Sequence, residues 1–236
     1  SYPYITDAKI AEQIDRLAKE RRVTVLATGI NPGFVMDALP IVLTGVCKEV
    51  KKIEVKRVMN AGGRRVPFQR KIGAGLTLEE FREKTNTKAI TGHIGLEQSI
   101  AMIADALGWK LEKIQVNPVE PVTAKKREKS EAMEVEPFHV AGLRQRATGI
   151  RAGEPVLVLD FEAYIGADEE YDAITIYGTP EIRQKITPCI HGDIGTVAII
   201  INSIPKVLNA PHGLVTMKDL PIPSASIEDM RIYVRR

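Results

Sequence analysis

Apolar and polar residues recur with two different periods along the chain, and each period predicts a different element. In residues 7–21 apolar side chains such as Ile10 and Ile14 recur at helical spacing, which predicts an amphipathic helix capped by Thr6. The short apolar run 23–27 that comes next predicts a buried strand. A helix followed by a buried strand is typical of an α/β layer, so we expect both to belong to a larger sheet.

Three further segments of the first half favour helices. Residues 35–46 are apolar on nearly every side, which predicts a buried helix kinked at Pro40. The run Thr77-Leu78-Glu79-Glu80 is a capping box and predicts a helix that starts near Leu78. A third helix is expected over 96–107, ending at Gly108.

The second half carries mainly strand patterns. Strands are predicted over 53–58, 111–122, 138–148, 155–164 and 173–177. A helix capped by Asp193 and interrupted at Ile204-Pro205 is predicted over 193–208, and residues 211–236 form a meandering arm. Strands in succession after helices predict an α/β plus α+β fold with a mixed sheet.

Composition narrows the class of protein. The 236 residues are 44% hydrophobic and carry a net charge of +3, which suits a globular chain with its own core and does not favour a nucleic-acid partner. Cys47 and Cys189 are isolated, so the sequence predicts neither a disulfide framework nor a metal site, and a reducing, cytoplasmic setting is expected. No apolar run approaches membrane-spanning length, so no membrane partner is expected.

A glycine-bounded turn is the first candidate for a ligand site. Thr28-Gly29-Ile30-Asn31-Pro32-Gly33-Phe34 connects the predicted strand to the predicted buried helix. Ligands of open α/β sheets bind beyond the carboxyl ends of strands, and Gly29 and Gly33 would let a ligand approach the backbone. A tight connection without a ligand is the alternative.

Basic residues and a histidine form a second set of candidates. Arg64 and Arg65 could clamp a carboxylate, and Lys71 precedes a helix start that would favour an anion; a solvated basic loop is the alternative. His93 lies between two glycines ahead of a helix, where it could contact a substrate or bond only to backbone.

Several segments in a fixed order resemble one family. They are 27–37 (Ala-Thr-Gly-Ile-Asn-Pro-Gly-Phe-Val-Met-Asp), 70–77 (Arg-Lys-Ile-Gly-Ala-Gly-Leu-Thr), 92–96 (Gly-His-Ile-Gly-Leu), 191–193 (His-Gly-Asp) and 216–221 (Thr-Met-Lys-Asp-Leu-Pro). The set resembles 2,4-diaminopentanoate dehydrogenase and the related native amine dehydrogenases, which are similar in layout to dihydrodipicolinate reductase.

The resemblance implies a division of the chain into three parts. Residues 1–36 would be the C-terminal part of a Rossmann-type dinucleotide-binding domain. Residues 37–190 would form a dihydrodipicolinate-reductase-like substrate and oligomerisation domain, and 191–236 a helix and arm that return toward the first domain. Such domains carry a Gly-x-Gly-x-x-Gly fingerprint, which this chain lacks. We therefore expect roughly a hundred residues before Ser1, with the catalytic carboxylate among them.

The resemblance also implies roles for single residues. Its cofactor-binding residues are Thr28, Gly29, Asn31, Pro32 and Gly33, its substrate-binding residues are Phe34, Arg64, Arg65, Lys71, Thr77 and Thr196, and His93 is its catalytic residue. Arg57 and Met59 are further pocket candidates. The cofactor would be NAD or NADP, no metal is expected, and the protein would form a homodimer or homotetramer.

The implied activity is reversible oxidative deamination of 2,4-diaminopentanoate or a similar amine, with residues 1–236 inactive by themselves. Two alternatives remain: an imine or aldehyde reductase of the same layout, and a non-catalytic oligomerisation module that truly starts at Ser1. The exact amine and the choice between NAD and NADP are left open by the sequence.

Overall fold

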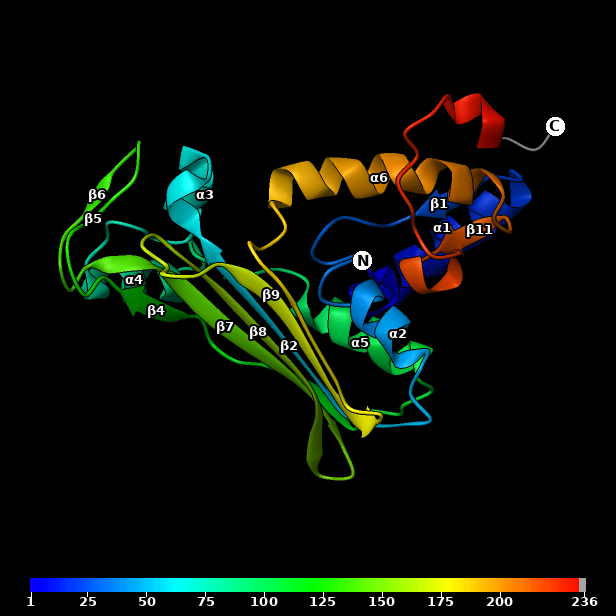
Figure 1. The fold of residues 1–236 in the computed structure, drawn as a ribbon, viewed down its shortest axis with the longest axis horizontal. Helices are drawn as coiled ribbons and strands as arrows, with labels where there is room; N and C mark the ends of the chain where they lie inside the picture. Colours follow the sequence, from blue (N-terminus) through cyan, green and yellow to red (C-terminus); the bar gives the residue numbers. More distant parts are fainter. Residues whose placement is uncertain (234–236) are drawn as a thin grey trace.

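Two sheets of different size organise the chain in this computed structural model, which describes residues 1–233. The smaller sheet is a parallel pair, β1 (Thr24–Leu26) with β11 (Gly213–Val215). Helices α1 (Ala8–Glu20) and α6 (Gly192–Leu208) contact this pair, at the right of Figure 1. The helix and strand predicted at the front of the chain are thus confirmed, but the strand is not buried as predicted, because Val23 and Val25 are exposed. The sheet partner of this strand comes from the far end of the sequence.

The larger sheet has seven strands in the order β10-β9-β2-β8-β7-β3, with β4 also paired to β7. Their bounds are β2 Glu49–Asn60, β3 Lys113–Val116, β4 Glu120–Thr123, β7 Val140–Arg151, β8 Glu154–Tyr164, β9 Tyr171–Thr179 and β10 Ile182–Ile186. The β2–β8 pair is parallel and the other pairs are antiparallel. The predicted mixed sheet is confirmed.

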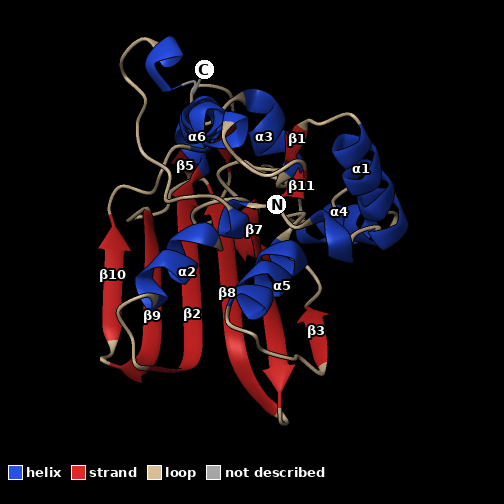
Figure 2. Cartoon of the chain, turned by 90° about the vertical axis from the view of Figure 1, so that its right-hand side faces the viewer, coloured by secondary structure: helices blue, strands red, loops and turns tan. Residues whose placement is uncertain are grey.

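One face of the large sheet holds the core. Helices α2 (Ala38–Thr44) and α5 (Leu96–Ala106) lie across this face (Figure 2). Successive side chains of a strand point to opposite faces of the sheet. On the face that the helices cover, side chains from neighbouring strands form mainly aliphatic rows across the sheet. One row joins Ile176, Ile53, Leu157 and Gly149, and the next joins Ile174, Val55, Leu159 and Ala147.

Short elements complete the large domain and the connections. These are α3 (Val66–Lys71), α4 (Leu78–Asn86), the hairpin β5 (Glu128–Lys129) with β6 (Glu134–Val135), and the 3-10 turns η1 (Pro3–Ile5), η2 (Ala61–Gly63), η3 (Met217–Asp219) and η4 (Met230–Tyr233). The capping box predicted at Thr77 is confirmed, because its hydroxyl accepts from Glu80 N and the Glu80 carboxylate accepts from Thr77 N. The helix stop at Gly108 is also confirmed, with φ of 65°.

Two predictions for the first forty residues were wrong. Asp7, not Thr6, caps α1, because its carboxylate accepts from the N–H of Ile10. The helix expected over 35–46 is only α2, because the backbone before it is held in a turn by the side chain of Asp37. Pro40 therefore lies in the first turn of a helix, where a missing N–H costs nothing, and it produces no kink.

The predictions around α6 also need correction. His191 is its N-cap and Asp193 lies in its first turn. Pro205 does not interrupt the helix, which continues to Leu208. The expected strand 111–122 is two strands, β3 and β4, separated by Asn117-Pro118-Val119, and both pair with β7. The arm 211–236 contains β11, which the sequence pattern did not indicate, and residues 234–236 lie outside the described part.

Three more elements have no counterpart among the predictions: α3, the β5–β6 hairpin and β10. Each is short, and two of them come after glycine- or charge-rich stretches that resemble loops in sequence. Among the helices of residues 1–233, none is long and apolar enough to cross a membrane.

Candidate functional site

Hydrogen bonds to one buried carboxylate, that of Asp37, hold the turn 28–34 in place. Asp37 accepts hydrogen bonds from Gly33 N at 2.8 Å, from Ala38 N at 2.7 Å and from the Ser99 hydroxyl at 2.8 Å. Ser99 belongs to α5, so the turn is anchored to the large domain. Gly33 has φ of 134°, and a Cβ there would stand 2.4 Å from Gly29 N, so glycine is required for this close chain crossing.

The loop that carries His93 packs against this turn. A Cβ at Gly95 would stand 2.6 Å from Cγ and Cδ of Pro32, which shows how closely the two segments meet. The N–H of His93 donates to Oε1 of Gln145 at 2.9 Å. Its imidazole stacks on the ring of Phe161, with 4.3 Å between centroids. His93 is therefore held between the turn and the sheet.

Next to the aliphatic rows, the sheet carries a row of mainly polar side chains near His93. Asp172 on β9 is paired with Arg57 on β2, Arg57 with Phe161 on β8, and Phe161 with Gln145 on β7. All four side chains are buried. The sequence contains a pattern that could have predicted this row. Arg57, Gln145 and Asp172 each stand at a position that points to the core, in strands whose other core-facing residues are apolar.

Arg57 and Asp172 form an ion pair whose nitrogen and oxygen are 3.0 Å apart, and each side chain is only 2% exposed. Both side chains also bind the backbone of Ile190. Arg57 donates to the Ile190 carbonyl oxygen, and the Ile190 N–H donates to Asp172 at 2.8 Å. Burial lowers the pKa of Arg57, and burial raises the pKa of Asp172 while the Arg57 charge opposes that rise. Among Arg57, Asp172 and Ile190, only Arg57 was predicted from the sequence as a pocket candidate.

Arg64 extends this buried cluster toward Cys189 and Glu170. Its Nη2 lies 3.5 Å from the Cys189 sulfur and 3.8 Å from Glu170 Oε2. Burial raises the pKa of the Cys189 thiol to about 11, so the thiol is neutral near pH 7. The cluster holds a protonated thiol, two carboxylates and two guanidinium groups.

Within residues 1–233, four predicted site residues each carry a buried polar atom without a hydrogen-bond partner. They are Thr28 Oγ1, Asn31 Oδ1, Arg64 Nη1 and His93 Nε2, and the same holds for Arg57 Nη1, Asp172 Oδ1 and Gln184 Oε1. Buried polar groups are nearly always paired in native proteins, and each exception calls for an explanation. Unpaired buried groups of this kind mark candidate positions for a ligand contact.

His93 is neutral over the physiological range. Burial lowers the pKa of its imidazole to about 3, and the positive charges of Arg57 and Lys71 act in the same direction. A neutral imidazole can donate one hydrogen bond and accept another. It is a poor acceptor for a proton at pH 7, so this environment suits a substrate contact better than a general base.

The start of α6 lies beside the turn 28–34 and lines a cavity together with it. The Thr196 hydroxyl accepts from Ile30 N at 3.4 Å, which joins α6 to the turn. Between them lies a largely apolar cavity of about 260 Å³. Its lining includes Ile30, Phe34, Ile190, Gly195, Ile199 and Pro223. The cavity brings the arm at Pro223 to the same region as the turn.

The structure separates the two arginines that the sequence analysis grouped. The Arg64 side chain is 8% exposed, whereas Arg65 is 69% exposed and lies 3.6 Å from Asp193. They do not form a buried pair, and a carboxylate clamp at this loop stays a prediction. A cavity of about 60 Å³ lies beside them, lined by Met59, Arg64, Arg65, Phe68, Gly192 and Asp193.

Lys71 and Thr77 differ in their relation to this site. Lys71 is close enough to His93 to influence its pKa. The Thr77 hydroxyl is exposed and fully engaged in the capping box of α4, so its expected contact with substrate has no support in its hydrogen bonds.

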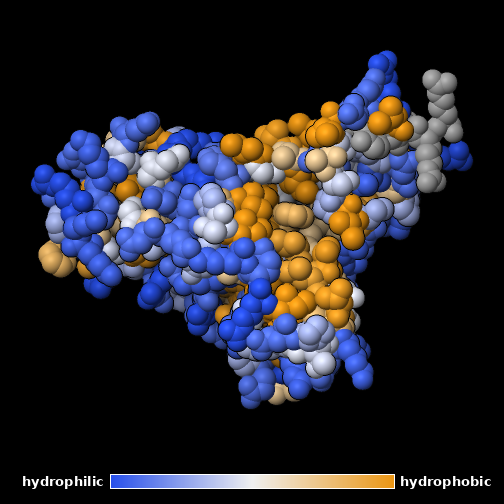
Figure 3. Space-filling model, viewed as in Figure 1, coloured by the Kyte–Doolittle hydropathy of each residue, from blue (hydrophilic) through white to orange (hydrophobic). Residues whose placement is uncertain are grey.

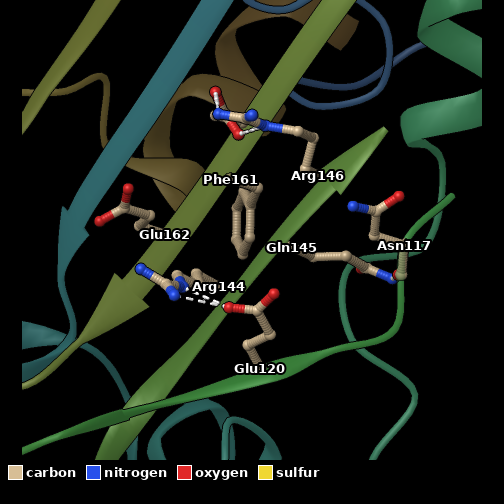
Figure 4. A pocket seen from close by; sticks show the side chains of 8 residues that line it. Asn117, Glu120, Arg144, Gln145, Arg146, Phe161 and Glu162 are labelled. Carbon is tan, nitrogen blue, oxygen red and sulfur yellow. Dashed lines mark hydrogen bonds and ion pairs between the residues drawn. The ribbon is translucent and has the colours of Figure 1, made fainter. Parts of the chain in front are cut away.

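A separate, charged cavity of about 310 Å³ lies along β4, β7 and β8 (Figure 4). Arg144 reaches Glu120 at 2.6 Å, and Arg146 reaches Asp160 at 2.6 Å. The lining also includes Gln145 and Phe161, the two residues that contact His93, although their side chains alternate in direction with those of Arg144, Arg146 and Asp160. No group of three His, Cys, Asp or Glu side chains placed to hold a metal ion occurs within residues 1–233.

Comparisons with known proteins identify the family to which the chain is similar. The family model described as "2,4-diaminopentanoate dehydrogenase C-terminal domain" matches residues 34–236. A 2,4-diaminopentanoate dehydrogenase from Acetoanaerobium sticklandii is 38% identical over 235 residues, covering 98% of this chain and 67% of that protein.

A solved structure is similar in fold. The amine dehydrogenase from Mycobacterium smegmatis superimposes with a TM-score of 0.79 at 21% identity, covering 94% of this chain and 66% of that one. The chain thus spans about two thirds of the length of both proteins. The predicted fold class is confirmed, and by the extent of these matches the chain belongs to the 2,4-diaminopentanoate dehydrogenase family.

Proposed function

We propose that this chain is the substrate-binding part of an NAD(P)-dependent amine dehydrogenase that deaminates 2,4-diaminopentanoate or a similar amino acid, reversibly. The observation that carries the proposal is the set of unpaired buried atoms on Thr28, Asn31, Arg64 and His93. The names of the two relatives support the same reaction class.

The turn 28–34 fits the nicotinamide end of NAD or NADP. Thr28 Oγ1 and Asn31 Oδ1 are unpaired, and a carboxamide could supply their partners. Gly29 and Gly33 keep the turn free of side chains where a flat ring would approach it. When bound, the cofactor supplies the redox chemistry by accepting a hydride from the amine-bearing carbon. The chain has no Gly-x-Gly-x-x-Gly run, so we assign only this end of the cofactor.

His93, Thr196 and the apolar cavity would hold the substrate. The neutral imidazole of His93 would orient the amine or its product through Nε2, and Thr196 would keep α6 against the turn. The apolar lining around Phe34 and Ile199 would exclude water from the reacting carbon. The base that takes the ammonium proton is a different group, because His93 is too weak a base for that role.

Arg64 would recognise the substrate's carboxylate. Its Nη1 is buried and unpaired, and a cavity of about 60 Å³ adjoins the side chain. Guanidinium groups bind carboxylates through charge-assisted hydrogen bonds. This favours amino acids over simple amines as substrates.

Residues 1–36 and 191–236 would be this chain's share of a dinucleotide-binding domain. The parallel β1–β11 pair is small, and apolar side chains around it are exposed: Ile10, Ile14 and Leu17 on α1, Val23 and Val25 at β1, and Val197, Ile200, Ile201 and Ile204 on α6. Figure 3 shows apolar side chains gathered over α6. Exposed patches of this extent mark interaction sites. We propose that further parallel strands of the same domain cover them.

A homodimer or homotetramer through the open face of the large sheet would complete the assembly. That face carries interleaved charges, with Lys56 2.9 Å from Glu162 and Arg146 2.6 Å from Asp160. Interleaved charges of both signs are complementary to a second copy of the same face. Light scattering of wild type and of Arg146→Glu would test this, and an unchanged mass in the variant would contradict it.

The activity is tested with the natural product of the gene. We expect reduction of NAD or NADP that depends on 2,4-diaminopentanoate, with release of one ammonia per cofactor reduced. Reduction without ammonia would favour the imine or aldehyde reductase. No reduction with any amine, together with a stable oligomer, would favour the non-catalytic module.

Arg64→Met and Arg65→Met separate the carboxylate proposal from general damage. Loss of a buried charge-assisted hydrogen bond costs about 1.5–3 kcal/mol, so kcat/KM for amino acids should fall roughly 10- to 100-fold in Arg64→Met, with simple amines little affected. Arg65→Met should cost less than Arg64→Met, because the Arg65 side chain lines the same cavity but is 69% exposed and screened by solvent. Equal losses for both substrate classes in Arg64→Met would refute the carboxylate contact.

A further inference from the structure

The Arg57–Asp172 pair binds both backbone groups of one residue. Ile190 donates its N–H to Asp172 Oδ2 at 2.8 Å, and its carbonyl oxygen accepts from Arg57 Nη2. The two side chains come from neighbouring strands, β2 and β9, in direct register. Residue 190 is thus held from both sides against the rigid sheet.

The chain after Ile190 leads directly to the turn 28–34. His191 caps α6, and its carbonyl oxygen accepts from Gly195 N at 2.7 Å. Gly195 packs so closely that a Cβ would stand 2.9 Å from the Ile190 side chain and 3.0 Å from that of Ile30. The next residue, Thr196, accepts from Ile30 N. Ile190 is therefore linked to the turn through one helical turn of α6.

We infer that Asp172 is a positioning residue, which with Arg57 fixes the start of α6 and through it the turn at Ile30. The inference rests on the proposed function, because positioning matters only where the turn and Thr196 meet a ligand. Asp172 itself acts through Ile190 and needs no contact with substrate.

Stability alone does not account for a buried ion pair at this place. Replacing such a pair by apolar residues of similar volume is often neutral or stabilising, because burying two charges costs as much as their attraction returns. An apolar pair could fill the same space on β2 and β9. It could not bind the N–H and the carbonyl oxygen of residue 190, so orientation of that residue is what the charged pair adds.

The test compares the double variant Arg57→Met/Asp172→Leu, the single variant Asp172→Asn, and the control Glu136→Gln. The double variant leaves neither member of the pair as an uncompensated buried charge, so it should fold, with a melting temperature lowered only by the two lost hydrogen bonds to Ile190. Glu136 pairs with Arg127 at 2.8 Å on the exposed surface, away from the proposed binding and oligomer surfaces, which makes it an ion-pair control. Amide hydrogen exchange at Ile190 and Ile30 is measured together with steady-state kinetics.

We expect both amides to exchange roughly tenfold faster or more in the double variant, and less so in Asp172→Asn, which retains one acceptor oxygen. Misplacement of the turn should lower kcat roughly 10- to 100-fold, with a smaller change in KM. The control should match wild type in every measurement. Faster exchange at Ile190 with unchanged exchange at Ile30 would overturn the inference, as would unchanged kcat in a variant whose two amides are both released.

Failure of the proposed function would look different. If the natural protein oxidised no amine, the exchange rates would still report whether the pair fixes α6 and the turn. A coupled change at Ile190 and Ile30 would then support the positioning link, and an uncoupled one would refute it.

Discussion

Gly95 lies directly against the ring of Pro32, and this contact joins the His93 loop to the turn that comes after β1. A Cβ at position 95 would stand 2.6 Å from two ring carbons, and Gly95 has φ of 116°. Neither the space nor the backbone conformation suits another residue. The contact therefore fixes the distance between the two segments that carry the predicted site residues.

Gly95→Ala should separate these segments. The backbone conformation costs about 1–2 kcal/mol, and the clash with Pro32 adds about 1–3 kcal/mol of overpacking. Gly153→Ala is the matched control, because Gly153 also has positive φ, at 77°, but no atom lies within 4 Å of its Cβ position. Chemical denaturation should show the larger loss for Gly95→Ala. Equal losses in the two variants would mean that the Pro32 contact carries no energy.

The stability of the protein should fall in acid because of His93. Its folded pKa of about 3 lies below the ordinary value of 6.5, so the unfolded chain binds the proton first. The stabilisation from burying the neutral ring is complete above pH 6.5 and declines as pH falls toward 3, at up to about 1.4 kcal/mol per pH unit. His93→Leu should remove this part of the decline. Urea denaturation of both proteins between pH 7 and pH 5 checks it, and parallel curves would contradict the buried neutral state.

Asp37→Asn should destabilise the protein more than Ser99→Ala. Asp37 accepts three hydrogen bonds, from Gly33, Ala38 and Ser99, and an amide could accept only part of them while presenting its own N–H to donors. We expect a loss of about 2–3 kcal/mol for Asp37→Asn and about 1 kcal/mol for Ser99→Ala. The free energy of unfolding measures both. If Asp37→Asn cost no more than Ser99→Ala, the carboxylate would not be the anchor of the turn.

Residues 1–236 alone should bind neither NAD nor NADP with useful affinity. The pyrophosphate of a dinucleotide rests on a glycine-rich turn at a helix N-terminus, and no such fingerprint occurs in this sequence. The nicotinamide end against Asn31 offers too few contacts by itself. Titration calorimetry checks the prediction, with the longer relative from Acetoanaerobium sticklandii as the positive control. Micromolar binding by residues 1–236 would show that the cofactor is held in another way.

Local chemistry determined much of the fold. The capping box at Thr77, the helix stop at Gly108, the tight turn at Gly29 and Gly33, and the strands β7, β8 and β9 were all predicted, because each depends on neighbours in sequence. The predictions failed where a distant contact prevailed over the local pattern. Asp37 is one example: it ends the turn before α2 only because the Gly33 amide and the Ser99 hydroxyl converge on it.

The site divides in the same way. The sequence by itself singled out Thr28, Asn31 and His93, since glycines and turns mark their segments, and it grouped Arg64 with Arg65 because they are adjacent. Only the tertiary structure buried Arg64 and exposed Arg65, and only the register of β2 with β9 brought Asp172 to Arg57. Burial and charge pairing arise between residues that are far apart in the chain. Sequence spacing therefore determined which segments are candidates for binding a ligand, and packing decided which of their side chains are buried.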